Sequence, residues 1–281
     1  MQVNPGAQPP TQASTTHSPL RADANAGRVA LVTGGGTGIG RATALELAAT
    51  GAAVVVCGRR SEPLESVVAE IVAGGGQALA VPADIRETEQ AQRVVELALS
   101  RFGHVDVLVN NAGGQFTAPA EEITDNGWLA VHRLAVDAAW AITRGVATSS
   151  MIPRRDGLIV FIGFSPQRGI PGFAHASSAR AAVANLASGL ALEWSRHRVR
   201  SVCLAVGTIE TEGLAQYPPE DVERWRRSVP LGRLGTTSEV AALIAFLATP
   251  AGAYITGTTI AVDGGADAWG MAEPPPAPDG S

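Results

Sequence analysis

A run of glycines near the start of the chain has the residue types and spacing of a phosphate-binding turn. It reads Thr33-Gly34-Gly35-Gly36-Thr37-Gly38-Ile39-Gly40, and its main glycines follow the spacing G-x-x-x-G-x-G. Glycine permits a tight turn and lets the backbone approach a pyrophosphate, and the N–H groups that open a following helix bind anions. The run therefore predicts a dinucleotide-phosphate site. The residues expected to form it are Thr33, Gly34, Gly36, Thr37, Gly38, Ile39 and Gly40.

Two arginines, Arg59 and Arg60, follow the second apolar segment. In dinucleotide-binding folds this position lies beside the adenosine ribose, where an acidic residue binds the 2′-hydroxyl of NAD. A guanidinium instead matches the 2′-phosphate of NADP in charge and geometry. The pair therefore favours NADP(H) over NAD(H) as the cofactor. A solvated basic pair is the alternative interpretation.

Two further segments follow the next strands at positions where a dinucleotide would lie. Ala83-Asp84-Ile85 comes after the third strand, so Asp84 and Ile85 are expected to contact the adenine. Asn110-Asn111-Ala112-Gly113 comes after the fourth strand, at the carboxyl edge where ligands bind in open sheets. Asn110, Ala112 and Gly113 are the expected cofactor contacts there, and no metal site is expected.

The elements that would position these residues alternate between short apolar strands and helices. Strands are expected at residues 29–33, 53–57, 77–81, 105–109, 158–162, 199–204 and 258–262. Helices are expected at residues 38–49, 63–73, 87–102, 126–151, 174–196 and 238–247. Alternation of this kind predicts parallel strands, and strands that are apolar throughout are covered by helices on both faces. The expected fold class is α/β, with a single Rossmann-type, doubly wound parallel sheet.

Composition limits the domain count and the partners. The chain has 281 residues, 46% of them hydrophobic, and a net charge of -5. This is enough for one domain, expected at residues 28–270, and it argues against nucleic-acid binding. Residues 1–27 and 271–281 are expected to be disordered tails because they are rich in proline and small polar residues. No secretory signal or membrane span is evident, so a cytoplasmic protein is expected.

Two smaller features complete this survey. Cys57 and Cys203 lie in apolar strands and are expected to be buried thiols in a reducing compartment. Residues 208–230 lack strong periodicity and contain Pro218-Pro219, which favours a mobile lid between two ordered elements.

From residue 28 to residue 265 the chain resembles the short-chain dehydrogenases/reductases. The glycine turn, Asn110-Asn111-Ala112-Gly113 and Ala261-Val262-Asp263-Gly264-Gly265 carry the resemblance. Within the family the chain is most similar to the 2,4-dienoyl-CoA reductases, through Gln115-Phe116 and Ala191-Leu192-Glu193-Trp194 among other segments. The resemblance implies a sheet of seven strands in the order 3-2-1-4-5-6-7. It also implies homo-oligomers, dimers or tetramers, built through the two long helices.

The family's catalytic Ser, Tyr, Lys and Asn are all changed. The matching positions here are Gly163 (or Phe164), Ala176, Arg180 and Ala135. Dienoyl-CoA reductases carry Ser at the Tyr position, keep the Lys, and use an Asn and a Tyr placed elsewhere. Their matches here are Ala176, Arg180, Asp137 and Ser165. After the sixth strand, Gly207, Ile209 and Thr211 match positions that hold the nicotinamide amide and a phosphate.

These changes bear on the reaction. Reducing an isolated ketone requires both an oxyanion stabiliser and a proton donor, and Ala176 supplies neither. Conjugate reduction leaves a delocalised enolate that hydrogen bonds stabilise, and its proton can come from water. Arg180 could stabilise that enolate, hold the nicotinamide ribose, or do both. An ion pair with Asp137 is an equally weighted alternative for Arg180.

Three other predictions concern the surroundings of Arg180. Ser165 is interpreted either as a hydroxyl donor at the mouth of the site or as a turn residue before Pro166. His175 could act as an acid or base, but one residue of shift from Ala176 turns it by about 100° on a helix. The substrate pocket is expected to be walled by Phe116, Phe164 and Phe173.

The predicted function is that of an NADP(H)-dependent oxidoreductase which reduces a conjugated carbonyl or an enoyl thioester without the usual Tyr and Lys. One alternative is a non-redox enzyme, such as a cyclase, dehydratase or isomerase, that uses Asp137, His175 and Arg180. The other alternative is a catalytically silent protein that binds the cofactor. The expected partner is a small-molecule substrate, with no nucleic acid and no membrane.

Overall fold

The computed structural model describes residues 18–165 and 169–269. Seven parallel strands form one sheet in the order β3-β2-β1-β4-β5-β6-β9. This confirms the predicted fold class and the strand order that the resemblance implied, with β9 as the seventh strand. The strands are β1 (Val29–Thr33), β2 (Ala53–Gly58), β3 (Ala78–Pro82), β4 (Val107–Asn110), β5 (Gly157–Phe164), β6 (Val199–Val206) and β9 (Thr259–Val262).

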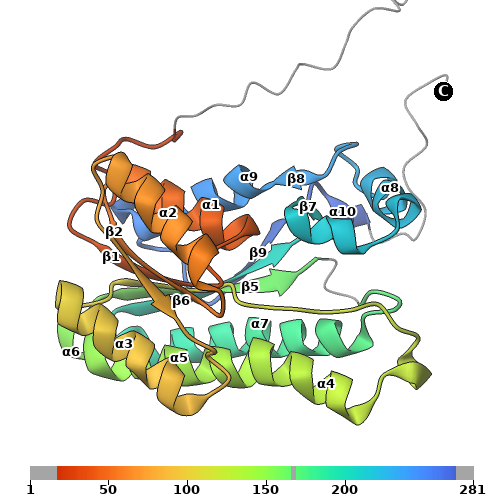
Figure 1. Ribbon diagram of the computed structural model, residues 1–281, viewed down its shortest axis with the longest axis horizontal. Coiled ribbons are helices and arrows are strands. Elements are labelled where there is room, and N and C mark those ends of the chain that lie inside the picture. The colour runs from red at the N-terminus through yellow and green to blue at the C-terminus, as the bar shows by residue number, and fades with distance from the viewer. Residues whose placement is uncertain (1–17, 166–168, 270–281) are drawn as a thin grey trace, which may run out of the picture.

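Helices cover both faces of the sheet (Figure 1). The helices over one face are α1 (Gly38–Ala49), α2 (Ser61–Ala73) and α9 (Thr237–Ala248), and those over the other are α3 (Thr88–Phe102), α5 (Ala138–Val146) and α7 (Ala174–Trp194). Successive strand residues serve opposite layers: Leu31 packs into one core cluster and Val32 into the other. Strands that are apolar on both sides therefore follow from the two helical layers. No helix in the described ranges is both long and apolar enough to cross a membrane.

The long helix predicted at residues 126–151 exists but is not uniform. It comprises α4 (Asp125–His132), α5, the short α6 (Ile152–Arg154), and two π-helical turns at Arg133–Asp137 and Ala147–Met151. Thr124 caps its start by accepting a hydrogen bond from the Gly127 N–H at 3.1 Å.

The segment 208–230, for which no strand or helix was predicted, contains a helix. It holds β7 (Ile209–Glu210), which pairs with β8 (Gly235–Thr236), a 3-10 turn at Glu212–Gln216, and α8 (Pro219–Arg227). Pro219 lies in the first turn of α8, where its missing N–H has no partner to lose. Acidic residues in the first turn and arginines in the last complement the helix dipole. The prolines start the helix rather than break it, and the mobility of this segment stays a prediction.

The ordered part of the chain includes residues before 28, the predicted start of the domain. Residues 18–27, expected to belong to a disordered tail, pack against α1 and α9. The Asn25 amide donates to Thr50 Oγ1 at 2.9 Å and to the Ala245 carbonyl at 3.1 Å. Asn25 is buried, and Leu20 packs against the core. The remaining parts of the predicted tails, residues 1–17 and 271–281, lie outside the described residues, as does residue 270.

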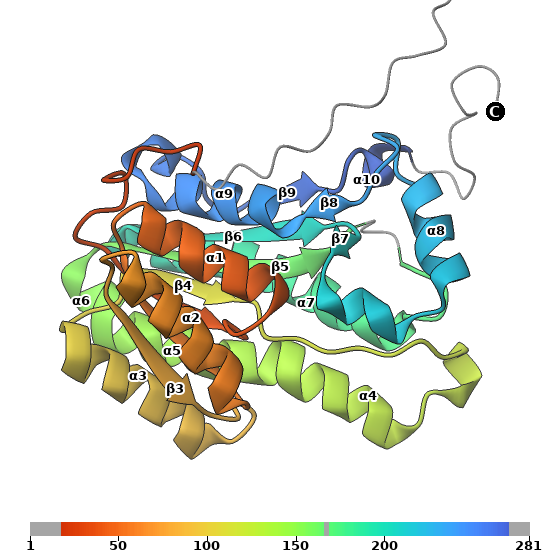
Figure 2. The same ribbon diagram turned by 45° about the horizontal axis from the view of Figure 1, so that its top comes forward.

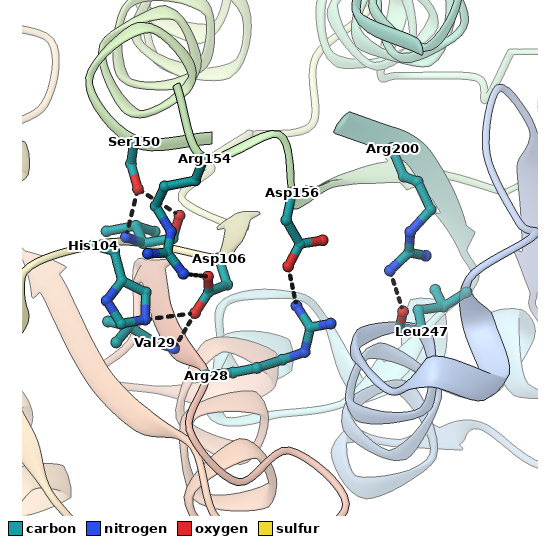
Figure 3. Close-up of polar contacts among 10 residues, drawn as sticks. Arg28, Val29, His104, Asp106, Ser150, Arg154, Asp156, Arg200 and Leu247 are labelled. Carbon is teal, nitrogen blue, oxygen red and sulfur yellow. Dashed lines mark hydrogen bonds and ion pairs between the residues drawn. The ribbon is translucent and has the colours of Figure 1, made fainter. Parts of the chain in front are cut away.

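The amino-terminal edge of the sheet is held by the buried carboxylate of Asp106 (Figure 3). It accepts a hydrogen bond from the Val29 N–H at 2.8 Å and lies 3.1 Å from His104 Nε2. Arg154 at the end of α6 lies 3.5 Å from its other oxygen. One side chain thus joins the starts of β1 and β4 to α6. The short helix α10 (Ala266–Trp269) lies near the opposite, carboxyl edge, toward which β5 and β9 point in Figure 2.

Candidate functional site

The glycine turn between β1 and α1 has a backbone that only glycine adopts easily. Gly34 and Gly38 have φ of +64° and +52°. A Cβ at Gly40 would lie 2.2 Å from the Gly34 carbonyl oxygen, so no larger residue fits. Thr37 precedes α1, is exposed, and its side chain does not cap the helix. The turn is therefore a tight cradle of backbone beside unused helix N–H groups, which suits a pyrophosphate.

Asn111, which the sequence predictions left out, holds this turn to β4. Its side-chain amide donates to the Thr33 carbonyl at 2.9 Å and to the Gly34 carbonyl at 3.2 Å. The Thr33 hydroxyl in turn accepts from the N–H groups of Asn111 and Ala112, at 3.0 and 2.9 Å. The sequence held a signal for this role. Asn111 directly follows β4, and in the predicted sheet β4 lies beside β1, the strand that ends in the glycine turn.

The neighbouring Asn110 has a structural role. It is buried, and its amide donates to Thr143 Oγ1 of α5 at 2.9 Å. Its Oδ1 has no hydrogen-bond partner among the described residues. The predicted cofactor residue Asn110 thus ties the carboxyl end of β4 to α5.

The arginine pair at the end of β2 is exposed and unpaired. Neither Arg59 nor Arg60 forms an ion pair within residues 18–165 and 169–269. The predicted adenine contact Asp84 is engaged by Arg86, whose hydrogen bonds lower the pKa of Asp84, with Arg59 adding to this. Ile85 is buried in the core, so its side chain does not face solvent. Two guanidiniums are therefore available for an anion beside β2.

The residues after β6 meet the glycine turn from the other side. The methyl group of Thr211 lies 3.3 Å from where a Cβ of Gly38 would be. Ile209 is buried. Gly207 lies against Asp263, and a Cβ there would be 2.9 Å from the Asp263 Cα. The predicted residues of this segment and of the glycine turn are thus brought together at one edge.

Arg180, at the position of the family's lysine, reaches the same edge from α7. Its Nη1 donates to the Ile162 carbonyl at 2.6 Å, and its Cζ lies 5.5 Å from the centre of the Phe164 ring. A Cβ at Gly113 would lie 2.0 Å from Arg180 Nη2, so the glycine is what gives the guanidinium its room. Burial lowers the pKa of Arg180, an effect that Cys203 partly offsets. An arginine stays charged at neutral pH even so.

The predicted ion pair between Arg180 and Asp137 is wrong. Asp137 is exposed on the π-helical turn at Arg133–Asp137. No ion pair joins it to Arg180 in the part of the chain that the structure describes. Asp137 therefore does not neutralise Arg180, and within the described residues Arg180 is a buried cation without a carboxylate ion-pair partner.

The Ser165 hydroxyl forms a hydrogen bond with Asp263 within the protein. This hydroxyl donates to the Asp263 carboxylate, which also accepts from the N–H groups of Gly265 and Asp267 at 2.9 and 2.8 Å. Burial opposes ionisation of Asp263, but these hydrogen bonds prevail and lower its pKa. The prediction of Ser165 as a free oxyanion donor is disfavoured because its single hydroxyl proton is already used. The alternative, a turn before Pro166, involves a residue outside the described ones.

His175 is buried at the start of α7. Its ring contacts the Phe116 ring, with a centroid distance of 4.3 Å and a tilt of 35° between the two planes. Neither ring nitrogen has a hydrogen-bond partner among the described residues. Burial lowers the pKa of His175, and the nearby His132 lowers it further. His175 is thus a neutral imidazole at physiological pH, enclosed beneath Phe116.

The other changed family positions are filled by small residues. Ala176 and Ala135 belong to one buried apolar cluster, against which Tyr217 and Trp225 pack. A Cβ at Gly163 would lie 2.7 Å from the sulfur of Cys203, so a serine there is excluded by that thiol. Burial raises the pKa of Cys203 to about 11, so the thiol is neutral. The missing serine is thus explained by a specific neighbour on β6.

A cavity of about 280 Å³ adjoins Arg180 between α7 and the strands β5, β6 and β9. Its lining residues are mostly small or polar: Gly163, Phe164, Gly169, Ser177, Arg180, Ala181, Ala184, Asn185, Ser188, Cys203, Ala205 and Thr259. Of the three predicted wall residues, Phe164 lines this cavity, whereas Phe116 and Phe173 do not. Within the described ranges no group of His, Cys, Asp and Glu forms a candidate metal site.

Over most of its length the chain is similar to known reductases. The family described as Enoyl-(Acyl carrier protein) reductase matches residues 34–267. A Bacillus subtilis protein named probable 2,4-dienoyl-CoA reductase is 37% identical over 243 residues, covering 85% of this chain and 96% of that protein. A 3-oxoacyl-[acyl-carrier-protein] reductase of Synechocystis is 39% identical over 241 residues, covering 85% and 96%.

Solved structures agree in fold. A candidate NAD(P)-dependent gluconate 5-dehydrogenase from Beutenbergia cavernae, with NADP bound at low occupancy, superposes with a TM-score of 0.82 and 37% identity. It covers 88% of this chain and 100% of its own. A citronellol catabolism dehydrogenase of Pseudomonas aeruginosa superposes with a TM-score of 0.80 and 39% identity, covering 89% and 99%.

Proposed function

Because the chain belongs to the short-chain dehydrogenase/reductase family, we propose that it is an NADP(H)-dependent oxidoreductase that reduces a conjugated carbonyl compound, such as an enoyl thioester. Its substrate is a small molecule, as for the family in general. The observation that carries the proposal is Arg180, a buried guanidinium that forms no ion pair with a carboxylate in the described part of the chain, one helical turn from an alanine where the family has its tyrosine.

The residues present fit a dinucleotide. The cradle at Gly34–Gly40 and the start of α1 would hold the pyrophosphate, with Thr37 and Thr211 beside it. Arg59 and Arg60 would bind the 2′-phosphate, because both are exposed and neither is paired in the described part of the chain. Bound NADPH supplies a hydride. NADP in a solved relative supports this choice of cofactor without deciding it.

Arg180 supplies the electrostatics. It donates one hydrogen bond within the described residues, to Ile162, and its other N–H groups are available to a ligand at the edge. A fixed positive charge in a buried site stabilises an enolate oxygen far better than the same charge in water. The guanidinium can do this without changing its protonation state, since it cannot act as an acid at neutral pH. The arrangement therefore suits a reaction in which charge is delocalised and the proton comes from elsewhere.

The alternatives have less support. A non-redox enzyme built on Asp137, His175 and Arg180 loses Asp137, which is exposed, and no other carboxylate forms an ion pair with Arg180 in the described ranges. A catalytically silent protein that binds the cofactor would use the whole phosphate site. It would give no role to Arg180, whose buried guanidinium forms no ion pair in the described part of the chain. The two free and buried cysteines fit a reducing compartment such as the cytoplasm.

The test is oxidation of NADPH in the presence of a panel of enoyl and dienoyl thioesters, with simple ketones as the comparison. We expect turnover with at least one conjugated thioester and none with the ketones. Arg180→Gln should lower kcat about 100-fold, the usual effect of removing an oxyanion donor. Binding of NADPH without oxidation by any member of the panel would overturn the proposal and favour the silent protein.

A further inference from the structure

Tyrosine is rare in this chain, and one of its two tyrosines packs against the buried cluster that contains Ala176, the position of the family's phenol. The two are Tyr217 and Tyr254. Tyr254 is fully exposed. Tyr217 comes from the segment between β6 and α8 and packs against the cluster that contains Ala176. The predicted lid, residues 208–230, thus brings the phenol of Tyr217 to the cluster that contains the position of the absent one.

Two aromatic contacts fix the position of Tyr217. Its ring lies 4.9 Å from Trp225 of α8 and 6.3 Å from Phe173, in both cases edge to face. Phe173 is the residue before α7, and Ala176 lies in the first turn of that helix. The aromatic rings therefore join the predicted lid to the start of α7. Figure 2 shows that α8 lies at one end of the molecule.

The Tyr217 hydroxyl lacks a well-formed hydrogen bond among the described residues, although the Gln115 side chain approaches it. The phenol oxygen is buried and has no hydrogen-bond partner among the described residues. Burial raises the pKa of Tyr217, and the approaching Gln115 side chain partly offsets this. A buried hydroxyl without a partner is unfavourable unless a ligand satisfies it. The phenol is therefore protonated and lacks only an acceptor.

The loop after β4 completes the surroundings. The Ala118 N–H donates to the Gly172 carbonyl at 3.0 Å, so this loop runs beside the segment that enters α7. Gln115 and Phe116 belong to it, and Phe116 covers His175. The titratable groups on the packed elements are His175, Arg180 and Glu193 on α7, Glu212 on the 3-10 turn, and Glu220, Asp221, Glu223, Arg224, Arg226 and Arg227 on α8. Burial and Gln115, rather than these groups, dominate the ionisation of Tyr217.

We propose that Tyr217 is the proton donor of the reaction, supplied by the lid in place of the tyrosine missing at position 176. This inference rests on the proposed reductase function. Bound NADPH would supply a hydride to the β-carbon of the conjugated thioester. The double bond then shifts to the bond between the α-carbon and the carbonyl carbon, and the π electrons of the carbonyl group move onto its oxygen to give an enolate. Arg180 stabilises that enolate. The Tyr217 O–H bond then breaks, its proton goes to the α-carbon, and its electron pair stays on the phenolate, which takes a proton from water.

A first experiment needs no substrate. The protein is labelled with tyrosine carrying carbon-13 at Cζ, and the two resonances are assigned with Tyr217→Phe and Tyr254→Phe. Spectra are compared with NADPH and with NADP⁺, whose nicotinamide ring is positively charged. A nearby positive charge polarises a phenol toward its ionised form, so the Tyr217 resonance should differ between the two complexes. The Tyr254 resonance should not change. An identical Tyr217 resonance in both complexes, or failure to bind either dinucleotide, would overturn the inference.

A second experiment uses whichever thioester the panel identifies. Tyr217→Phe keeps the ring and removes only the hydroxyl, and we expect it to lower kcat by roughly 10²–10⁴ with little change in KM. Tyr254→Phe is the matched control and should leave both unchanged. A Tyr217→Phe protein as fast as the wild type contradicts the inference while leaving the reductase function intact. If no thioester reacts, the reductase function fails, and Tyr217 fails as its proton donor.

Discussion

Single residues explain why the changed family positions belong together. Gly113 leaves space that the Arg180 guanidinium fills, and Gly163 leaves space that the Cys203 thiol fills. A lysine at position 180 would need less room beside Gly113, and a serine at position 163 would need more beside Cys203. Two of the altered residues, Arg180 and Gly163, are therefore each matched by a close neighbour, Gly113 and Cys203, so that neither change leaves a gap.

The pair Gly113 and Gly114 offers a direct test of that arrangement. In Gly113→Ala the new methyl group would lie 2.0 Å from Arg180 Nη2 and must displace the guanidinium. We expect about a 100-fold loss of kcat, since displacement by about 1 Å is enough for this. In Gly114→Ala the nearest atom, on Leu134, is 3.9 Å away, so activity should be kept. Equal effects of the two substitutions in the NADPH oxidation assay would contradict the role of Arg180.

Cofactor preference is also decided by single residues. Arg59→Asp should weaken NADPH binding roughly 10- to 100-fold, the range for losing hydrogen bonds to a charged group, and should change NADH binding far less. Arg93→Asp on α3 makes the same change of net charge at another exposed position and is the control. Dissociation constants from nicotinamide fluorescence measure both. Equal losses for the two cofactors would mean that Arg59 does not bind the 2′-phosphate.

His175 should make the stability of the protein depend on pH. Its folded-state pKa is lowered from the ordinary value of 6.5, mainly by burial. The unfolded chain therefore binds a proton that the folded chain does not, and stability falls as the pH drops below 6.5. His175→Leu removes this proton uptake and two unpartnered nitrogens. Urea unfolding should show a smaller loss of stability on acidification in the variant. An unchanged loss would show that His175 titrates normally.

At the scale of elements, regular patterns were predictable and the irregular connections were not. The strand order, the helices over each face and the glycine turn follow from apolar periodicity and family motifs. The helix α8 was missed because it has few apolar residues and begins with prolines that resemble a loop. Asp137 and Ser165 were misplaced for a different reason. Asp137 is exposed on a π-helical turn, and the Ser165 hydroxyl is bound by Asp263, which is far away in the sequence.

The edge opposite the site provides a structural variant that should leave function alone. Asp106 joins β1, β4 and α6, so Asp106→Asn replaces one acceptor oxygen with an amide that faces buried donors. We expect the free energy of unfolding to fall by roughly 1–3 kcal/mol. The affinity for NADPH should not change, because the proposed dinucleotide site lies at the carboxyl edge. Denaturation and binding measured on the same preparation check both parts, and a loss of affinity would show that the two edges are coupled.

For the whole molecule, the exposed apolar side chains indicate where copies of the chain would meet. Trp128, Leu129 and Trp140 lie on α4 and α5, and Leu192 lies on α7 with 79% of its surface exposed. These helices form one layer on a single side of the sheet (Figure 1). Large apolar residues gathered on neighbouring elements are typical of an interface. A homo-oligomer built through this layer is the arrangement we propose.

Light scattering should therefore give a mass that is a multiple of 28.8 kDa. Leu192→Glu places a charge inside an interface that must bury on the order of 1,000 Å² to be stable, and it should shift the protein toward smaller species. Val72, 55% exposed on α2 in the opposite layer, gives the control Val72→Glu, which should not alter the mass. A wild-type monomer, or dissociation caused by Val72→Glu instead, would place the interface elsewhere. Since Tyr217 and Arg180 come from one chain, loss of assembly through α7 should reduce activity only as far as it loosens the helix that carries Arg180.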